Sequence, residues 1–106
     1  MRVRIVTPLE AVLDREANHL SARGAHGAFT VLPRHVDFVA ALLPGLVTVD
    51  DEVLAVDEGL LVKQGARVVL TVREAVVGAP LEALRRAVEE RFLNLDERER
   101  RARSAL

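Results

Sequence analysis

The amino-acid sequence predicts a mainly β protein with an α appendage, in which an N-terminal β-sandwich precedes a C-terminal helical region. Residues 1–77 contain short apolar segments separated by turn residues, at the spacing of roughly 8–12 residues that is typical of sandwiches and barrels. Valine is abundant, and its β-branched side chain suits a pleated, half-buried surface. After Gly78-Ala79-Pro80 the apolar spacing changes to three and four, as in an amphipathic helix. The domains are therefore drawn at 1–77 and 78–106.

The first part of the sandwich region is expected to hold four short strands. Residues 2–6 alternate with a period of two. Two further strands are expected over 10–13 and 18–22, with the polar Asp14-Arg15-Glu16 as their separator. The turn from Gly24 to Gly27 contains glycines that allow positive φ, and it leads into a strand over 27–32.

The second part is expected to hold a hairpin and two more strands. Residues 46–49 and 53–56 flank Asp50-Asp51-Glu52, which we interpret as a solvated hairpin turn. Strands over 60–63 and 67–73 follow, each preceded by a glycine-containing turn. In the last strand Val68, Leu70 and Val72 share one face, which is therefore predicted to be the buried one.

Between these two parts lies an apolar run, Val36 to Leu43, bounded by Pro33 and by Pro44-Gly45. A small domain can bury only part of such a run. We therefore expect alternate residues to face the core and the remainder to lie in an interface with another protein.

The C-terminal region is expected to begin as an amphipathic helix at Pro80, since proline suits a first helical turn. Asn94-Leu95-Asp96 suggests a break, so that a second helix starts at Asp96 and completes a hairpin. A single helix continuing to about Arg103 is equally compatible with the pattern. The highly charged tail after Asp96 either frays or is truncated at Leu106. The predicted apolar stripe comprises Leu81, Leu84, Val88, Phe92 and Leu95.

Composition and motifs argue against chemical functions. The net charge is −1 and Trp and Tyr are absent, which disfavours nucleic acid as a partner. The chain has no cysteine, and His19, His26 and His35 lack the close-spaced pairs of zinc ligands. Ser21 and Ser104 stand in no nucleophile motif. We therefore expect no metal, no cofactor and no catalytic activity.

Neither a signal pattern nor an apolar run of about 20 residues is present, so we expect a soluble, cytoplasmic chain that can still lie against a membrane complex.

The segment from Gly24 to Gly45 contains the signature Gly24-x-x-Gly27-x-Phe29-x-Val31-Leu32-Pro33-Arg34-His35, followed by Pro44-Gly45. This signature resembles that of the epsilon subunit of rotary F-type ATP synthases, which is called delta in mitochondria. Later strands of that family are matched by Gly59-Leu60-Leu61-Val62 and by Val68 to Ala75, so the resemblance covers essentially the whole chain.

The resemblance implies a ten-stranded β-sandwich with a C-terminal helical hairpin, in a non-catalytic rotor-stalk subunit of a proton- or sodium-translocating enzyme. It implies that the sandwich binds the gamma subunit and touches the membrane c-ring. It further implies that the helices can reach the alpha and beta subunits and inhibit ATP hydrolysis, on the cytoplasmic face of the bacterial inner membrane. The residues expected at the gamma or c-ring interface are Arg34, His35, Val36, Phe38, Val39 and Leu42.

Some positions depart from the family pattern. Ala28 stands where many relatives carry an acidic residue that is thought to meet the c-ring, and Asp37 replaces a usual proline. With the short tail, these changes resemble the alternate, N-type ATPase branch. Relatives that bind ATP carry the motif [IL]-D-x-x-R-A, which here reads Leu81-Glu82-Ala83-Leu84-Arg85-Arg86. Glu82 and Arg85 are therefore the candidate ATP-binding residues, although an ordinary exposed role for Arg85 fits the helix as well.

The residues leave a second functional class open, namely a stand-alone β-sandwich module that senses ATP or another small anion, or that acts as an adaptor. Micromolar binding of ATP by the isolated chain, measured by calorimetry, would distinguish this class from a stalk subunit.

Overall fold

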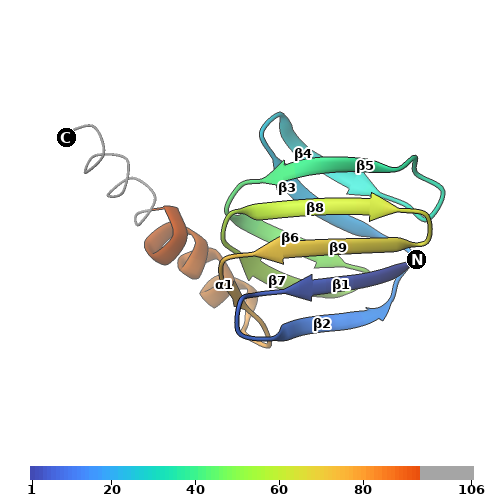
Figure 1. Cartoon of the computed structure of the whole chain (residues 1–106). Coiled ribbons are helices and arrows are strands. Elements are labelled where there is room, and N and C mark those ends of the chain that lie inside the picture. The colour runs from blue at the N-terminus through green and yellow to red at the C-terminus, as the bar shows by residue number, and fades with distance from the viewer. Residues whose placement is uncertain (94–106) are drawn as a thin grey trace.

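The structure of the protein is a computed structural model that describes residues 1–93. Strands make up most of it, and one helical segment follows them, as the sequence predicts (Figure 1). The helical segment is α1 (Leu81–Ala87), which continues as the π-helical η1 (Val88–Leu93). The strands are β1 (Arg2–Val6), β2 (Ala11–Glu16), β3 (Leu20–Gly24), β4 (Gly27–Val31), β5 (Phe38–Leu42), β6 (Gly45–Val49), β7 (Glu52–Val56), β8 (Gly59–Gln64), β9 (Arg67–Val72) and β10 (Ala75–Val76).

The strands form one 10-stranded hydrogen-bonded sheet that folds into two layers (Figure 1). The front layer has the order β5-β8-β9-β1-β2, in which β1 and β9 run parallel and the other neighbours antiparallel. The back layer has the order β4-β3-β6-β7-β10. The two layers join where Gly24, the last residue of β3, pairs with Leu42 of β5. The predicted ten-stranded β-sandwich is therefore confirmed.

The core lies between the two layers and is built from aliphatic side chains. Val68, Leu70 and Val72 of β9 all point into it, which confirms the face predicted from their alternation. Burying a side chain of this size contributes about 1.5–3 kcal/mol, so the core is the main stabilising element of the domain. Its other large members are Val3, Ile5, Leu13, Leu20, Val31, Leu42, Val47, Val49, Leu54, Val56 and Leu61.

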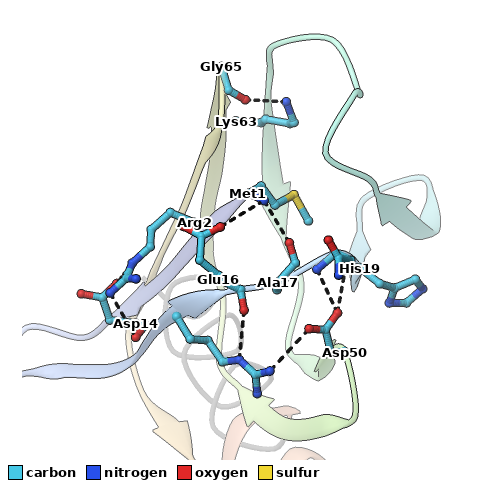
Figure 2. Close-up of polar contacts among 11 residues, drawn as sticks. Met1, Arg2, Asp14, Glu16, Ala17, His19, Asp50, Lys63 and Gly65 are labelled. Atoms are coloured by element: carbon cyan, nitrogen blue, oxygen red, sulfur yellow. Dashed lines mark hydrogen bonds and ion pairs between the residues drawn. The ribbon is translucent and has the colours of Figure 1, made fainter.

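Two charged side chains, Lys63 and Asp57, are buried with their polar atoms bonded. Nζ of Lys63 donates to the backbone oxygen of Gly65 at 2.7 Å and so closes the β8–β9 turn (Figure 2). Asp57 accepts from the backbone N–H of Glu58 at 2.7 Å and lies 3.7 Å from the guanidinium of Arg73. These partners offset the cost of removing the polar groups from water.

The prediction that Asp14-Arg15-Glu16 separates two strands is wrong, because all three residues belong to β2. Asp14 and Glu16 stand on the outer face of the front layer, opposite Arg4 and Arg2 of β1. Opposite charges facing each other across antiparallel strands stabilise the pairing, so a charged stretch is compatible with an edge strand. The next strand, β3, begins at Leu20 instead of residue 18.

The helix packs on the outer face of the back layer, but its apolar stripe differs from the predicted one. Leu84 and Phe92 are buried against Ala55 of β7, together with Ala87 and Val88. Leu81 is 47% exposed, so its assignment to the buried stripe is wrong. Pro80 is the N-cap instead of a first-turn residue, with φ −60° and ψ 152°. Leu95, the helix start at Asp96, the continuation to Arg103 and the end at Leu106 lie outside the described residues.

The β6–β7 hairpin confirms the predicted pairing, although its turn is less solvated than expected. Asp50 has φ +52°, and its Oδ1 accepts from the backbone N–H groups of Asn18 and His19, both at 3.0 Å (Figure 2). Its Oδ2 lies 3.4 Å from a guanidinium nitrogen of Arg15. Asp51, in contrast, has a side chain that is 95% exposed. Asp50 therefore ties this turn to the β2–β3 connection.

Replacing Asp50 with alanine is expected to destabilise the protein by about 1–3 kcal/mol, because two backbone donors lose their acceptor. Urea unfolding followed by circular dichroism measures the change. Asp50→Asn is the matched control, since it keeps an acceptor oxygen and tolerates positive φ. It loses only the ion pair with Arg15, which is worth about 0–1 kcal/mol at a surface. Equal stability of Asp50→Ala and wild type would contradict the assigned role.

Candidate binding surfaces

The loop that joins β4 to β5 is held in place by two hydrogen bonds, one within its backbone and one from the side chain of Asp37. The N–H of His35 donates to the backbone oxygen of Leu32 at 3.0 Å, which closes a turn after Pro33. Asp37 accepts from the N–H of Gly65 at 2.8 Å and thereby ties the loop to the β8–β9 turn. The loop is thus a defined surface at one end of the sandwich.

Ring contacts of Phe38 connect this loop to β4. The ring of His35 lies 4.7 Å from that of Phe38, and Nδ1 of His35 donates to the backbone oxygen of Val36 at 2.8 Å. Phe38 also contacts Phe29 of β4 edge-to-face, with ring centroids 6.1 Å apart. Such ring pairs contribute about 0.5–1.5 kcal/mol beyond burial. Phe38 therefore serves as a half-buried support for the loop as well as a candidate contact.

The predicted interface residues divide between surface and core. Val36 is 74% and Val39 64% exposed, and Arg34 and His35 are exposed as well. Leu42 is 2% exposed and belongs to the core, so the prediction that it lies at an interface is corrected. The alternation along β5 explains this division, because successive side chains point to opposite faces of a sheet. We call Leu32, Arg34, His35, Val36 and Val39 the loop surface.

A shallow hollow of about 360 Å³ lies beside this surface, between the β3–β4 hairpin and β5. The hairpin turn contains Gly27, whose φ of +113° confirms the expected positive value, whereas Gly24 ends β3 without a positive φ. Ala28 is exposed and lines the hollow with Phe29 and Val39. The hollow therefore has a methyl group, and no charged group, at position 28.

The two candidate ATP residues stand on the same helix but do not line the same hollow. Glu82 is exposed in the first turn of α1. Arg85 lines a second hollow of about 400 Å³ between the helix and the back layer, whose lining includes Arg23 and Ser21 but not Glu82. Arg23 is therefore a second cation at this hollow that the motif did not indicate.

A basic cluster on the outer face of the front layer was not predicted. Arg2, Arg4 and Arg67, which we call the arginine triad, line a small hollow of about 170 Å³ together with Asp14. Nε of Arg2 donates to Asp14 at 2.7 Å (Figure 2). The cluster depends on the parallel pairing of β1 with β9, which brings Arg2 opposite Arg67. The alternation of Arg2 and Arg4 was visible in the sequence, but their neighbour across the sheet was not.

The hydrogen bond from Arg2, followed by the charges of Arg2, Arg4 and Arg67, holds the pKa of Asp14 below its ordinary value. A carboxyl group whose pKa is lower in the folded state stabilises the fold above its unfolded pKa of about 3.9. This contribution is lost as the pH falls through the folded pKa.

We expect Arg2→Met to move the pKa of Asp14 upward, toward the ordinary value, because the hydrogen bond and the nearest charge are removed. Titration of the Asp14 carboxyl carbon by NMR between about pH 2 and 6 measures this shift. Arg86→Met, which removes an exposed charge on α1, should leave the titration unchanged. An ordinary pKa for Asp14 in the wild type would contradict the prediction.

Among residues 1–93 no group of His, Cys, Asp or Glu side chains is placed to hold a metal ion. In the same part of the chain, no helix is both long and apolar enough to cross a membrane.

Comparison with known protein families gives one match over most of the chain. Residues 1–78 match the family described as ATP synthase, Delta/Epsilon chain, beta-sandwich domain. ATP synthase epsilon chain 2 of Cereibacter sphaeroides is 33% identical over 110 residues, which cover 97% of this chain and 75% of that protein. The ATP synthase epsilon chain of Rickettsia africae is 43% identical over 47 residues, and there the chain spans 42% of the relative's length.

Comparison with solved structures supports the same fold. The chain resembles part of the mitochondrial ATP synthase of Euglena gracilis, in a structure that contains OSCP, F1 and the c-ring. The TM-score is 0.68 at 24% sequence identity, and the match covers 83% of this chain and 61% of the other. At this identity the likeness concerns the fold of the β-sandwich.

Proposed function

Because the chain belongs to the delta/epsilon family of ATP synthase subunits, we propose that it is a non-catalytic subunit of the central stalk of an F-type ATP synthase. In this role it turns with the rotor and couples the catalytic head to the ion-translocating c-ring by binding the gamma subunit. The observation that carries the proposal is the match of residues 1–78, the whole β-sandwich, to the family. Catalysis would then take place on other subunits.

The loop surface is the proposed contact with gamma and the c-ring. It combines exposed apolar side chains, of which Val36 is 74% exposed, with the polar Arg34 and His35. Apolar side chains bind by leaving water, and an arginine adds directional hydrogen bonds to carboxylates or carbonyls. Through these contacts the subunit would be peripheral to the membrane, on the cytoplasmic face of a bacterial inner membrane. The helical region would supply any regulation of ATP hydrolysis.

Co-purification with the gamma subunit tests this proposal. The full chain and purified gamma should elute as one complex in size-exclusion chromatography. We expect Val36→Asp to weaken the complex about tenfold or more, because it places an unpaired charge in a desolvated contact. Leu9→Asp is the control, since Leu9 is 93% exposed in the β1–β2 turn, at the opposite end of the sandwich from the loop (Figure 1).

Absence of any complex between gamma and the wild-type chain would overturn the proposed function. If gamma binds the wild type, Val36→Asp and Leu9→Asp equally well, the stalk assignment stands and the loop surface is the wrong contact.

One observation favours a second candidate function, the binding of ATP. Arg85 and Arg23 line the same hollow of about 400 Å³, which Glu89 also lines, so two cations and one carboxylate would face a polyphosphate there. Isothermal calorimetry of the full chain with ATP tests this function. Micromolar affinity that is lost in Arg85→Ala would support it, whereas no heat of binding at millimolar ATP would exclude it.

A further inference from the structure

The pairing of β5 with β8 ends at the loop between β4 and β5. Phe38, the first residue of β5, pairs with Lys63 of β8. In the same register Val36 would stand opposite Gly65, the first residue of the β8–β9 turn. The N–H of Gly65 donates instead to the side chain of Asp37 at 2.8 Å. A carboxylate therefore takes the place of a backbone acceptor at the end of this strand pair, and the chain before it leaves the sheet as a loop.

Gly65 is held at both of its polar backbone groups. Its N–H donates to Oδ1 of Asp37, and its backbone oxygen accepts from Nζ of Lys63 at 2.7 Å, a bond that Figure 2 shows. Both bonds are charge-assisted, and such bonds are roughly twice as strong as neutral ones. The φ of Gly65 is +59°, a value that glycine adopts without strain. We call Asp37, Lys63 and Gly65 the turn clamp, because two side chains from different segments fix one turn residue.

Lys63 is the buried member of the turn clamp. It is 2% exposed and shares the inner face of β8 with Leu61. Burial of an ammonium group is costly unless the group is bonded, so a lysine at this position needs a reason. Gly65 is exposed, and water can serve its backbone oxygen in the absence of a lysine. The turn therefore does not need Lys63 for its hydrogen bonding, which indicates that the buried charge fixes the position of Gly65.

Asp37 links the turn clamp to the exposed residues of the loop. It directly follows Val36, which is 74% exposed. The backbone oxygen of Val36 accepts from Nδ1 of His35 at 2.8 Å, and the ring of His35 lies 4.7 Å from that of Phe38. A displacement of Asp37 would therefore move Val36 and His35 together. The position of Gly65 is in this way transmitted to the loop surface.

We propose that Asp37 and Lys63 are positioning residues, which act through Gly65 to hold the loop surface in the conformation that its partner binds. The proposal rests on the proposed function, because it concerns the contact that is assigned there to the loop surface. A loop that is ordered before binding loses less conformational entropy on association, so the turn clamp raises affinity without touching the partner. Lys63 acts only in this way, since it is too buried to make a contact of its own.

Amide hydrogen exchange of the full chain, followed by NMR, tests the turn clamp without any partner. We expect Lys63→Met, which keeps an apolar stem in the core, to accelerate exchange of the N–H groups of Gly65 and His35 about tenfold. Neither N–H is bonded to Lys63, so the effect must pass through the clamp. We expect Asp37→Ala to accelerate the same two amides. The amide of Leu70 in the centre of β9 should exchange as in the wild type, which shows that both variants stay folded.

Affinity for the purified gamma subunit tests the consequence for binding. We expect Lys63→Met and Asp37→Ala each to raise the dissociation constant about five- to tenfold. Asp37→Asn should stay within about threefold of the wild type, because its amide oxygen can still accept from the N–H of Gly65. Asp51→Ala is the matched control and should bind like the wild type, since the Asp51 side chain is 95% exposed in the β6–β7 turn.

Unchanged exchange at His35 in both Lys63→Met and Asp37→Ala would refute the turn clamp. Faster exchange with unchanged affinity for gamma would refute the positioning role, because the partner would then not depend on the conformation of the loop. The stalk function stands in both of these cases. If gamma does not bind the wild type at all, the stalk function is refuted and the positioning role with it.

Discussion

Alanine at position 59 is expected to destabilise the sandwich by about 3 kcal/mol or more, at the upper end of the cost of overpacking. A Cβ atom on Gly59 would lie 2.1 Å from the backbone oxygen of Thr71 and 2.8 Å from Cα of Val72. Both are backbone atoms of β9, which pairs with β8 at this position, so no side chain can rotate away. The strand pair itself must separate to admit the methyl group.

Urea unfolding measures this loss of stability, and Gly45→Ala provides the control. A Cβ on Gly45 would meet the nearest atom, Cβ of Arg23, at 3.4 Å, which is ordinary contact. We therefore expect Gly45→Ala to stay within about 1 kcal/mol of wild type. A Gly59→Ala protein as stable as Gly45→Ala would show that β8 and β9 do not approach as closely as described.

Aspartate in place of Leu42 is expected to prevent stable folding, at a cost of about 3–5 kcal/mol. Leu42 is 2% exposed in the core between the layers, where a carboxylate has neither water nor a cation. A domain of this size has a total stability of about 5–15 kcal/mol, so this one change removes a large part of it. Circular dichroism and thermal unfolding of the purified variant measure the effect.

Val39→Asp is the matched control, because it makes a similar change on the same strand with the side chain on the opposite face. Val39 is 64% exposed, so the new carboxylate stays in water and the fold should persist within about 1 kcal/mol. If both variants unfold, Val39 is covered within the chain. If both fold, Leu42 is not part of the core, and the inside and outside of β5 have been assigned wrongly.

Local patterns predicted the elements whose two faces differ most. In β9, alternation alone identified Val68, Leu70 and Val72 as the buried face. In β5, alternation predicted that the apolar run would divide between core and surface. The register of pairing then decided which residues go to which side, and it placed Leu42 inside. A period of two determines that the faces alternate, but only packing against a second layer determines which face is buried.

Contacts between distant segments could not be predicted from these patterns. Asp50 reads as a solvated turn residue until the β2–β3 connection is placed beside it and supplies two N–H groups. The sequence alone indicates that Asp14 and Glu16 separate two strands. The strand register shows instead that they face arginines of β1. Polar residues are ambiguous in sequence, because the same side chain suits a turn and the outer face of a strand.

The sequence by itself determined a β-sandwich over residues 1–77, a helix after Pro80 and, through the signature from Gly24 to Gly45, the family to which the chain belongs. These features depend on neighbouring residues or on a linear motif. Only the tertiary structure decided that Leu42 is core, that Gly59 must be glycine, and that Arg2, Arg4 and Arg67 share one face. Each of these depends on which strands are neighbours. The parallel pairing of β1 with β9 brings together residues that lie near the beginning and near the end of the domain's sequence.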